Sequence, residues 1–310
     1  MRIIVTGGAG FIGSNLVDFL LKNNHEVIVI DDLSSGKMIN LEKSLNRITL
    51  IHSQLEKVDL NQFKEIDSVV HLAAQVSVPL SISNFKSSSE TNIISTLNIL
   101  NFCNEKKIPL VYASSSAVYG NLNIGDDQNS KVDLLSPYAA DKYLIEIYSA
   151  VLFKLNKLSS IGLRFFNVYG PRQDPTSPYS GVISVFIDRI IKNKIINIYG
   201  GSQTRDFVHV NDVILAISRS IEMTKQKAVN ETVNILTGKT TSIDDLAAIV
   251  YQKLNQTDKK KYSPMQKGDP MKSDGSTKKM KNFLGIKPSS MILIKDGLSE
   301  TIDFLRDSKN

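Results

Sequence analysis

Apolar and polar positions along the first two-thirds of the chain follow two different periods. Short apolar runs rich in β-branched residues predict strands at 3–6, 27–31, 49–51, 68–72, 110–114 and 160–164. Longer stretches with apolar residues three or four positions apart predict helices, chiefly at 12–23, 90–105 and 137–155. Strands that alternate with helices are typical of βαβ units, so we expect an α/β fold with a doubly wound parallel sheet.

The pattern changes after residue 170. Prolines and a glycine at 171–181 mark a loop, and shorter helical and strand patterns follow it. We therefore predict a first domain at 1–170 and a smaller α/β lobe, which binds the substrate, at 171–203 and 224–310. The intervening residues 204–223 are expected to return to the first domain.

The turn after the first predicted strand is rich in glycine. It reads Gly-Gly-Ala-Gly-Phe-Ile-Gly at 7–13, so a G-x-G-x-x-G motif follows a strand and opens a helix. Glycines adopt backbone conformations that other residues avoid, and they let a pyrophosphate approach the helix N-terminus, whose amides attract anions. Asp31 ends the second strand, where a carboxylate binds the adenosine ribose and repels a 2′-phosphate. A Rossmann-type domain that binds NAD is therefore predicted, with Asp32 as the alternative ribose ligand.

Tyr138 and Lys142 are candidates for acid/base chemistry. The sequence at 136–142, Ser-Pro-Tyr-Ala-Ala-Asp-Lys, is typical of a helix start with Ser136 as the N-cap. Residues four apart on a helix share one face, so we expect the ammonium to lower the phenol's pKa from its usual ~10. A phenol tuned in this way is a usable general acid/base. The spacing taken alone also fits an amphipathic surface pair.

A serine run follows the strand predicted at 110–114. Ser114, Ser115 and Ser116 stand at the carboxyl end of that strand, which is the edge where doubly wound sheets bind ligands. Such a run fits a turn, an activated nucleophile or a hydrogen-bonding site. The chain has no Gly-x-Ser-x-Gly elbow, and its four histidines suggest no hydrolase triad. We therefore interpret the hydroxyls as hydrogen-bond partners of a ligand.

Composition narrows the choice of partners. The formal net charge is +6, but Lys and Arg are spread along the chain, which argues against nucleic acid. Cys103 is the only cysteine, so no internal disulfide can form and a reducing, cytoplasmic setting is favoured. The apolar run at 3–5 is too short for a signal peptide, and no stretch approaches the ~20 apolar residues that cross a bilayer. We expect no membrane partner and no metal site.

Five segments together carry a family resemblance. They are Thr-Gly-Gly-Ala-Gly-Phe-Ile-Gly at 6–13, His-Leu-Ala-Ala-Gln at 71–75, the serine segment at 114–120, the Tyr138/Lys142 pair and Leu-Arg-Phe-Phe-Asn-Val-Tyr-Gly-Pro at 163–171. In combination they resemble the extended short-chain dehydrogenase/reductases, especially the UDP-glucose and UDP-N-acetylglucosamine 4-epimerases. The likeness spans nearly the whole chain.

This resemblance implies roles for individual residues. Tyr138 would be the acid/base, Ser115 would hold the sugar 4-hydroxyl with Ser116 as its alternative, and Lys142 would bind the nicotinamide ribose. The NAD site would comprise Gly7, Gly10, Phe11, Ile12, Gly13, Asp31, Asp32, Ser35, Gly36, Gln54, Leu55, Ala73, Ala74, Gln75, Asn92, Tyr138, Lys142 and Phe166. The nucleotide-diphosphate sugar would meet Ser77, Ser115, Ser116, Tyr138, Asn167, Tyr199, Arg205, Gln266, Asp269 and Ser273. Each of three of these residues also has an ordinary structural explanation. Asn92 could be a polar residue of a helix, Phe166 could be a core residue, and Arg205 could form a surface ion pair with Asp206.

The implied reaction is a transient oxidation at carbon 4 of the sugar. Hydride passes to NAD as Tyr138 takes the 4-hydroxyl proton, the 4-keto sugar rotates, and the hydride returns to the other face. Three positions depart from the family. Gln266 replaces a diphosphate-binding Arg, with Lys267 as a candidate substitute, and Gln54 replaces an Asp that contacts adenine. Ser273 stands where glucose-restricted members carry a bulky Tyr, which favours N-acetylhexosamine substrates.

Other functions remain open at this point. Related 4,6-dehydratases carry an acid beside the hydroxyl residue, whereas Ser116 and Ala117 follow Ser115 here, which favours epimerisation. A reductase would consume cofactor, and a non-catalytic NAD-binding regulator would have lost the chemistry. The resemblance also implies a homodimer through the helices at 90–105 and 138–155, whose apolar residues can equally pack inward.

Overall fold

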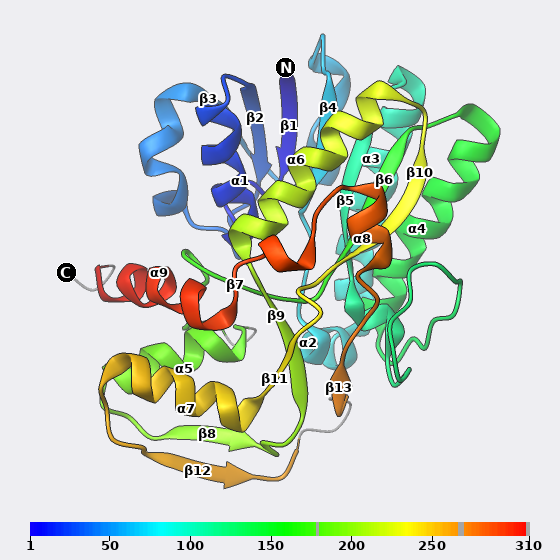
Figure 1. Cartoon of the computed structure of the whole chain (residues 1–310). Helices are drawn as coiled ribbons and strands as arrows, with labels where there is room; N and C mark the ends of the chain where they lie inside the picture. The colour runs from blue at the N-terminus through cyan, green and yellow to red at the C-terminus, as the bar shows by residue number, and fades with distance from the viewer. Residues whose placement is uncertain (178–179, 266–269, 308–310) are drawn as a thin grey trace. The chain divides into compact units, whose positions relative to one another are not determined.

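The computed structural model describes residues 1–177, 180–265 and 270–307 (Figure 1). The chain forms two compact units. Unit 1 comprises Met1–Val118, Leu134–Arg164 and Ile214–Val233. Unit 2 comprises Tyr119–Asp133, Phe165–Val213 and the described part of 234–310. Each unit is thus assembled from segments that are separated in the sequence.

A seven-stranded sheet forms the centre of unit 1, in the order β10-β6-β5-β4-β1-β2-β3. Its strands are β1 (Arg2–Thr6), β2 (Glu26–Asp31), β3 (Ile48–His52), β4 (Ser68–His71), β5 (Leu110–Ser115), β6 (Ser160–Phe165) and β10 (Asn230–Ile235). β1 pairs in parallel with both β2 and β4, β2 with β3, and β4 with β5. Because the strand order reverses between β1 and β4, the predicted doubly wound α/β fold is confirmed.

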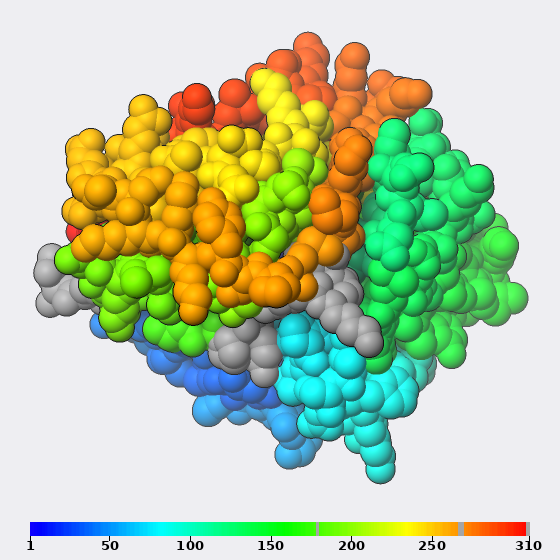
Figure 2. All heavy atoms as spheres, turned by 90° about the horizontal axis from the view of Figure 1, so that it is seen from below, coloured from blue at the N-terminus to red at the C-terminus, as the bar shows by residue number. Residues whose placement is uncertain are grey.

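Helices flank this sheet and bury its strands. Ile3, Ile4 and Val5 of β1 are fully buried, as expected of parallel strands that are covered on both faces. The helices are α1 (Phe11–Lys22), α2 (Val78–Ser83), α3 (Phe85–Lys106), α4 (Pro137–Asn156) and α6 (Val210–Gln226), which begins in unit 2. α2 and α3 pack against α4 and adjoin it at the surface (Figure 2). In the described residues, no helix is long and apolar enough to cross a membrane.

α3 begins at Phe85, about one turn before the helix predicted at 90–105. Its first turns contain the buried Ser88 and Ser89 in place of apolar residues. Ser88 Oγ donates a hydrogen bond to Gln75 Oε1 over 2.8 Å. An apolar period cannot reveal a helical segment whose buried positions are hydroxyls, so the prediction starts too late.

Unit 2 combines small sheets with helices. β9 (Thr204–His209) pairs with β7 (Asn167–Tyr169), β11 (Thr240–Ser242) and β13 (Lys272–Ser273), and β8 (Ile196–Tyr199) pairs with β12 (Lys260–Ser263). Its helices are α5 (Val182–Ile191), α7 (Ile243–Leu254), α8 (Lys278–Phe283) and α9 (Ile294–Asp307). α5, α7 and α9 pack together around a core that includes Phe186, Leu246 and Leu298.

Candidate active site

The glycine turn between β1 and α1 has the shape of an anion cradle. Gly7 has a φ of +70°, which favours glycine, and a Cβ on Gly13 would fall 2.1 Å from the Gly7 carbonyl oxygen. A Cβ on Gly10 would also meet that oxygen, at the less severe distance of 3.2 Å. The turn is therefore most tightly packed at Gly7 and Gly13 and less so at Gly10.

The N-terminus of α1 points its amides out of this turn. Phe11 and Ile12 form the start of the helix, Gly10 is the N-cap, no side chain caps the helix, and no acidic residue lies in its first turn. The free N–H groups and the positive end of the helix dipole favour a bound anion. Such a cradle fits the pyrophosphate of a dinucleotide.

Asp31 holds the glycine turn from the end of β2. Its Oδ2 accepts a hydrogen bond from Ala9 N (2.8 Å) and its Oδ1 accepts one from Leu33 N (2.9 Å). Burial raises the pKa of this carboxyl. Each carboxylate oxygen has a second lone pair, so a ribose hydroxyl can still donate to Asp31. Asp32 accepts from both N and Oγ of Ser34.

The loop after β4 is fixed by two buried polar side chains. Thr6 Oγ1 accepts from Leu72 N and Ala73 N, each at 3.2 Å, and lies 2.8 Å from His71 Nδ1. Burial and the nearby Lys142 charge lower the pKa of His71 to about 3, so its imidazole is neutral at physiological pH. This Thr6–His71 contact holds Ala73, and with it Ala74 and Gln75, beside the glycine turn.

Ser115, Tyr138 and Lys142 all lie in unit 1. Ser115 is the last residue of β5, and α4 starts at Pro137 with the Ser136 hydroxyl accepting from Ala139 N, as predicted. The Ser115 side chain lies near enough to the Tyr138 phenol to lower its pKa, and Ser115 Oγ accepts from Ala117 N over 3.1 Å. Lys142 Nζ lies 6.0 Å from the centroid of the Tyr138 ring and donates to the carbonyl oxygen of Ala113 over 3.0 Å. The structure thus brings a hydroxyl, a phenol and an ammonium to the carboxyl end of β5.

The electrostatics of this trio correct one expectation. Sequence reasoning expects Lys142 to lower the pKa of Tyr138, but burial raises this pKa, the Asp141 charge raises it further, and the nearby Ser115 side chain opposes both effects. Burial also lowers the pKa of Lys142 to about 8, against the effect of Asp141. The expectation is wrong because a sequence shows the spacing of two charges and not their desolvation.

A buried ion pair joins α4 to β6. Arg164 of β6 donates to Glu146 of α4 through Nε (2.9 Å) and Nη2 (2.6 Å), and Ser114 Oγ donates to the same carboxylate. Glu146 stands one turn after Lys142, which stands one turn after Tyr138, so the three share a face. The pair therefore fixes the face of α4 that carries Tyr138 and Lys142.

Unit 2 contains a separate pocket of about 230 Å³. It is lined by Asn167, Val182, Phe186, Asn197, Tyr199, Gln203, Arg205 and Ile243. Asp206, beside Arg205 in the sequence, accepts hydrogen bonds from the backbone N–H groups of Thr237, Gly238 and Lys239. A guanidinium, an amide and aromatic side chains in one hollow suit a ligand that has both an anionic and a planar part.

Comparison with known proteins decides the family. Residues 3–235 match the model of the NAD dependent epimerase/dehydratase family. A putative UDP-glucose 4-epimerase of Methanocaldococcus jannaschii is 37% identical over 313 residues, which cover 99% of each chain. The chain belongs to this family. The predictions of an extended short-chain dehydrogenase/reductase, of an epimerase-type enzyme and of NAD as its cofactor are confirmed.

Solved structures agree with this assignment. The UDP-glucose 4-epimerase of Thermotoga maritima, crystallised with UDP-glucose, has a TM-score of 0.92 at 32% identity, with 100% of both chains covered. The UDP-N-acetylglucosamine 4-epimerase of Methanobrevibacter ruminantium M1, in complex with UDP-N-acetylmuramic acid, has a TM-score of 0.92 at 35% identity, covering 99% of this chain and 98% of the other. This enzyme therefore shares its fold with nucleotide-sugar epimerases over its full length.

Several residues that the family resemblance implies have other contacts in this enzyme. Ser77 is buried and its hydroxyl caps α2 by accepting from Leu80 N. Leu55 is part of the core of unit 1, whereas Gln54 and Ser35 are exposed and Gly36 packs near Asp31. Ser116 begins a short 3-10 turn after β5. Phe166 is buried in unit 2, with its ring centroid 6.4 Å from that of Tyr119. Gln266, Lys267 and Asp269 lie outside the described residues.

Other residues of the enzyme's candidate site carry no signal in the sequence. Asn197, Gln203 and the apolar lining of the unit 2 pocket come from separate elements, and only the fold brings them together. Thr6 and His71 fall within segments that carry the resemblance, but neither has an assigned role. Glu146 had a usable signal, since it continues the spacing of four that joins Tyr138 to Lys142.

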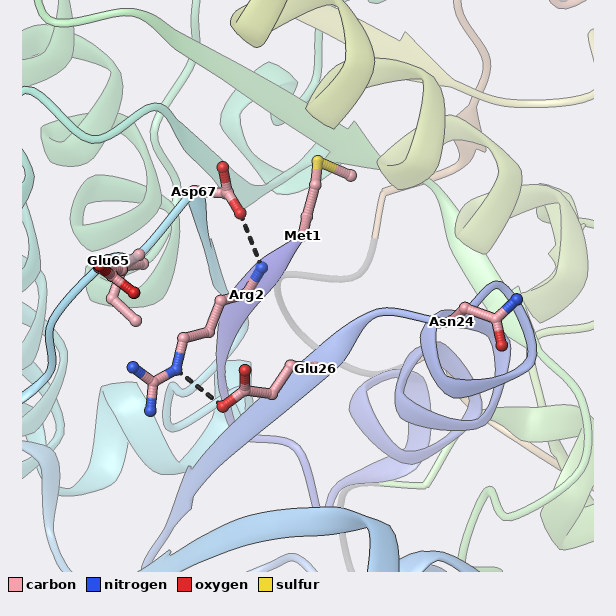
Figure 3. Close-up of a pocket in the computed structure, with 7 residues that line it drawn as sticks. Met1, Arg2, Asn24, Glu26, Glu65 and Asp67 are labelled. Atoms are coloured by element: carbon pink, nitrogen blue, oxygen red, sulfur yellow. Dashed lines mark hydrogen bonds and ion pairs between the residues drawn. The ribbon is translucent and has the colours of Figure 1, made fainter.

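A larger hollow, of about 530 Å³, lies at the opposite edge of the sheet. Met1, Arg2, Asn24, Glu26, Glu65, Ile66 and Asp67 line it, and Figure 3 shows Arg2 bonded to both Glu26 and Asp67. These residues stand at the amino ends of β1 and β2 and in the loop before β4. Open α/β sheets bind ligands outside the carboxyl ends of their strands, so this hollow is not the candidate site.

Proposed function

We propose that the enzyme interconverts the carbon 4 epimers of a UDP-sugar, either UDP-N-acetylglucosamine and UDP-N-acetylgalactosamine or UDP-glucose and UDP-galactose. The observation that carries the proposal is that Ser115, Tyr138 and Lys142 meet at the carboxyl end of β5 in a chain of this family, with Lys142 Nζ 6.0 Å from the Tyr138 ring. A phenol placed beside a hydroxyl and an ammonium can exchange a proton with a sugar hydroxyl that binds next to it.

Each member of the trio has one task in this reaction. Ser115 holds the sugar 4-hydroxyl, and the Tyr138 oxygen takes its proton and later gives a proton back. Lys142, as an ammonium, would bind the nicotinamide ribose. NAD, bound at the glycine cradle of Gly7, Gly10 and Gly13, would supply a hydride acceptor for carbon 4 of the sugar and a positive ring charge. Because burial raises the pKa of Tyr138, proton removal depends on that ring charge.

The pocket of unit 2 would hold the nucleotide part of the substrate. Arg205 is 8% exposed and lines this pocket, where a guanidinium can bind two diphosphate oxygens at once. Phe186 and Tyr199 offer faces against which a pyrimidine base can pack. Asn167 Nδ2 donates to Ser273 Oγ over 3.3 Å, so the small side chain at 273 is held near a second polar group. A side chain of this size favours a sugar with an N-acetyl group.

The assembled enzyme would be a homodimer formed through α3 and α4. Exposed apolar residues gather on these two packed helices, namely Ile94, Leu97, Ile147, Tyr148, Val151 and Leu155. Leu155, at 72%, is the most exposed of these residues. An apolar surface of this kind on a pair of helices is typical of an interface between copies of one chain.

The test is to incubate the purified enzyme with each of the four UDP-sugars and to follow two signals. Proton NMR reports the configuration at carbon 4, and absorbance reports any net reduction of NAD. We expect interconversion without a net change in absorbance. Tyr138→Phe should stay folded and lose at least about a hundredfold in turnover, whereas Tyr148→Phe, an exposed tyrosine of the same helix, should keep wild-type turnover. Net NADH formation would contradict the proposal, as would an active Tyr138→Phe variant.

A further inference from the structure

Asp141 lies on α4 between the two acid/base residues, directly before Lys142. The residue is 8% exposed, and its Oδ2 accepts hydrogen bonds from Asn92 Nδ2 (3.0 Å) and from Ser89 Oγ (3.2 Å) on α3. Both donors are neutral groups, so they fix the carboxylate in place and leave its charge intact. A buried charge held in this way acts on its neighbours more strongly than it would in water.

The same hydrogen bonds connect Asp141 to the loop after β4. Asn92 Oδ1 accepts from Gln75 N over 2.7 Å, and Asn92 Nδ2 donates to Gln75 O over 3.1 Å. One amide side chain therefore joins the carboxylate of α4 to the loop backbone that is proposed to line the nicotinamide site. Buried polar side chains are tolerated where their polar atoms are hydrogen-bonded, as these are, and this explains why the buried face of α3 is polar.

Few other charges face this cluster within unit 1. α2, which packs on α4, reads Val-Pro-Leu-Ser-Ile-Ser and has no charged residue. On α3, Glu90 has a side chain that is 57% exposed and pairs with Lys86. Glu146 of α4 is bonded to Arg164 of β6, so that pair is neutral as a whole.

Two further titratable groups of the sheet are uncharged. His71 on β4 is neutral because burial lowers its pKa to about 3, and Tyr112 on β5 is neutral because burial raises its pKa. The Asp141 charge is thus the electrostatic influence that Tyr138 and Lys142 share: it raises the pKa of both. It opposes burial at Lys142 and adds to burial at Tyr138.

We propose that the buried Asp141 carboxylate, fixed by Asn92 and Ser89, is a positioning residue whose charge holds Lys142 in its ammonium form beside Tyr138. The proposal rests on the proposed function, since it concerns the same acid/base pair. It gives α3 a part in the chemistry, because Asn92 on this helix holds both the Asp141 carboxylate and the loop after β4 in place.

The pH dependence of kcat/KM for Asp141→Asn tests this role. Without the Asp141 charge, both Tyr138 and Lys142 should lose their protons at lower pH. The acid limb of the profile, set by Tyr138, and the alkaline limb, set by Lys142, should therefore both move to lower pH. Relative to its own maximum, the variant should be about threefold faster than wild type on the acid limb and about threefold slower on the alkaline limb. Asp141→Glu should restore both limbs. Glu90→Gln, which removes an exposed charge of α3 next to Ser89, should move neither.

Asp141→Ser is a second variant that removes the charge and keeps a hydroxyl able to accept from Asn92. The proposal would be overturned if either variant folded but kept the pH profile of the wild type, or if both variants lost the circular dichroism spectrum of the folded protein.

A second readout needs no sugar. It is the ultraviolet absorbance of phenolate in NAD-bound protein, measured as the difference between the protein with Tyr138 and its Tyr138→Phe variant. Tyr138 should ionise at lower pH in Asp141→Asn, even if no UDP-sugar is epimerised, so failure of the proposed function is distinguishable from failure of this inference.

Discussion

Replacing Glu146 with Gln removes the charge that compensates Arg164 in the interior of unit 1. The two side chains are 6% and 5% exposed and are joined over 2.6 Å and 2.9 Å. Breaking a buried pair from one side costs about 3–5 kcal/mol, because the remaining charge stays buried without its partner. The Gln amide still accepts one hydrogen bond, so we expect a loss of about 3 kcal/mol in the free energy of unfolding.

Urea unfolding followed by circular dichroism measures this loss, and unit 1 offers a matched control. Arg2 and Glu26 pair over 2.8 Å with side chains that are 32% and 58% exposed, so Glu26→Gln should cost less than about 1 kcal/mol. Equal small losses in the two variants would refute the reasoning. Replacing both members by apolar residues, Glu146→Leu with Arg164→Met, should cost less than Glu146→Gln alone.

Four other predictions concern the site and the surface. Gly13→Ala should cost more than about 2 kcal/mol in urea unfolding, since its Cβ would overlap a carbonyl oxygen at 2.1 Å. Gly10→Ala should cost less stability than Gly13→Ala, because its Cβ would lie 3.2 Å from the Gly7 carbonyl oxygen, and it should weaken NAD binding at least about tenfold by calorimetry, because its methyl enters the proposed pyrophosphate site. Unchanged affinity would contradict the cradle. Turnover should fall as pH rises through about 8, where Lys142 loses its proton, and a flat alkaline profile would contradict this. Leu155→Glu should shift the protein from dimer to monomer in sedimentation, and an unchanged dimer would place the interface elsewhere.

The parts of this protein that sequence reasoning predicts well are those with local signals. Strands β1, β4 and β6 are buried on both faces, so their apolar runs are continuous and easily recognised, whereas the partly exposed β10 was not predicted. The glycine turn needs particular residues at fixed spacing, and Ser136 with Pro137 marks the start of α4 in the same way. Each of these features depends on residues that are neighbours in the chain.

Features that depend on distant residues could not be predicted. Asn92 and Asp141 are 49 positions apart, and nothing in either segment indicates that an amide meets a carboxylate. The direction of the Tyr138 pKa shift depends on burial, which only the folded chain determines. The pocket around Arg205 likewise collects residues from five segments of unit 2 between 167 and 243.

The fate of the hydrogen at carbon 4 tests the central claim most directly. The enzyme would be given the UDP-sugar that it interconverts, labelled with deuterium at carbon 4, and the epimer formed would be analysed by mass spectrometry and proton NMR. If Tyr138 removes only the hydroxyl proton and the hydride leaves and returns within one site, the product keeps the label at carbon 4. Loss of the deuterium to water in the epimer formed would contradict transient oxidation at that carbon.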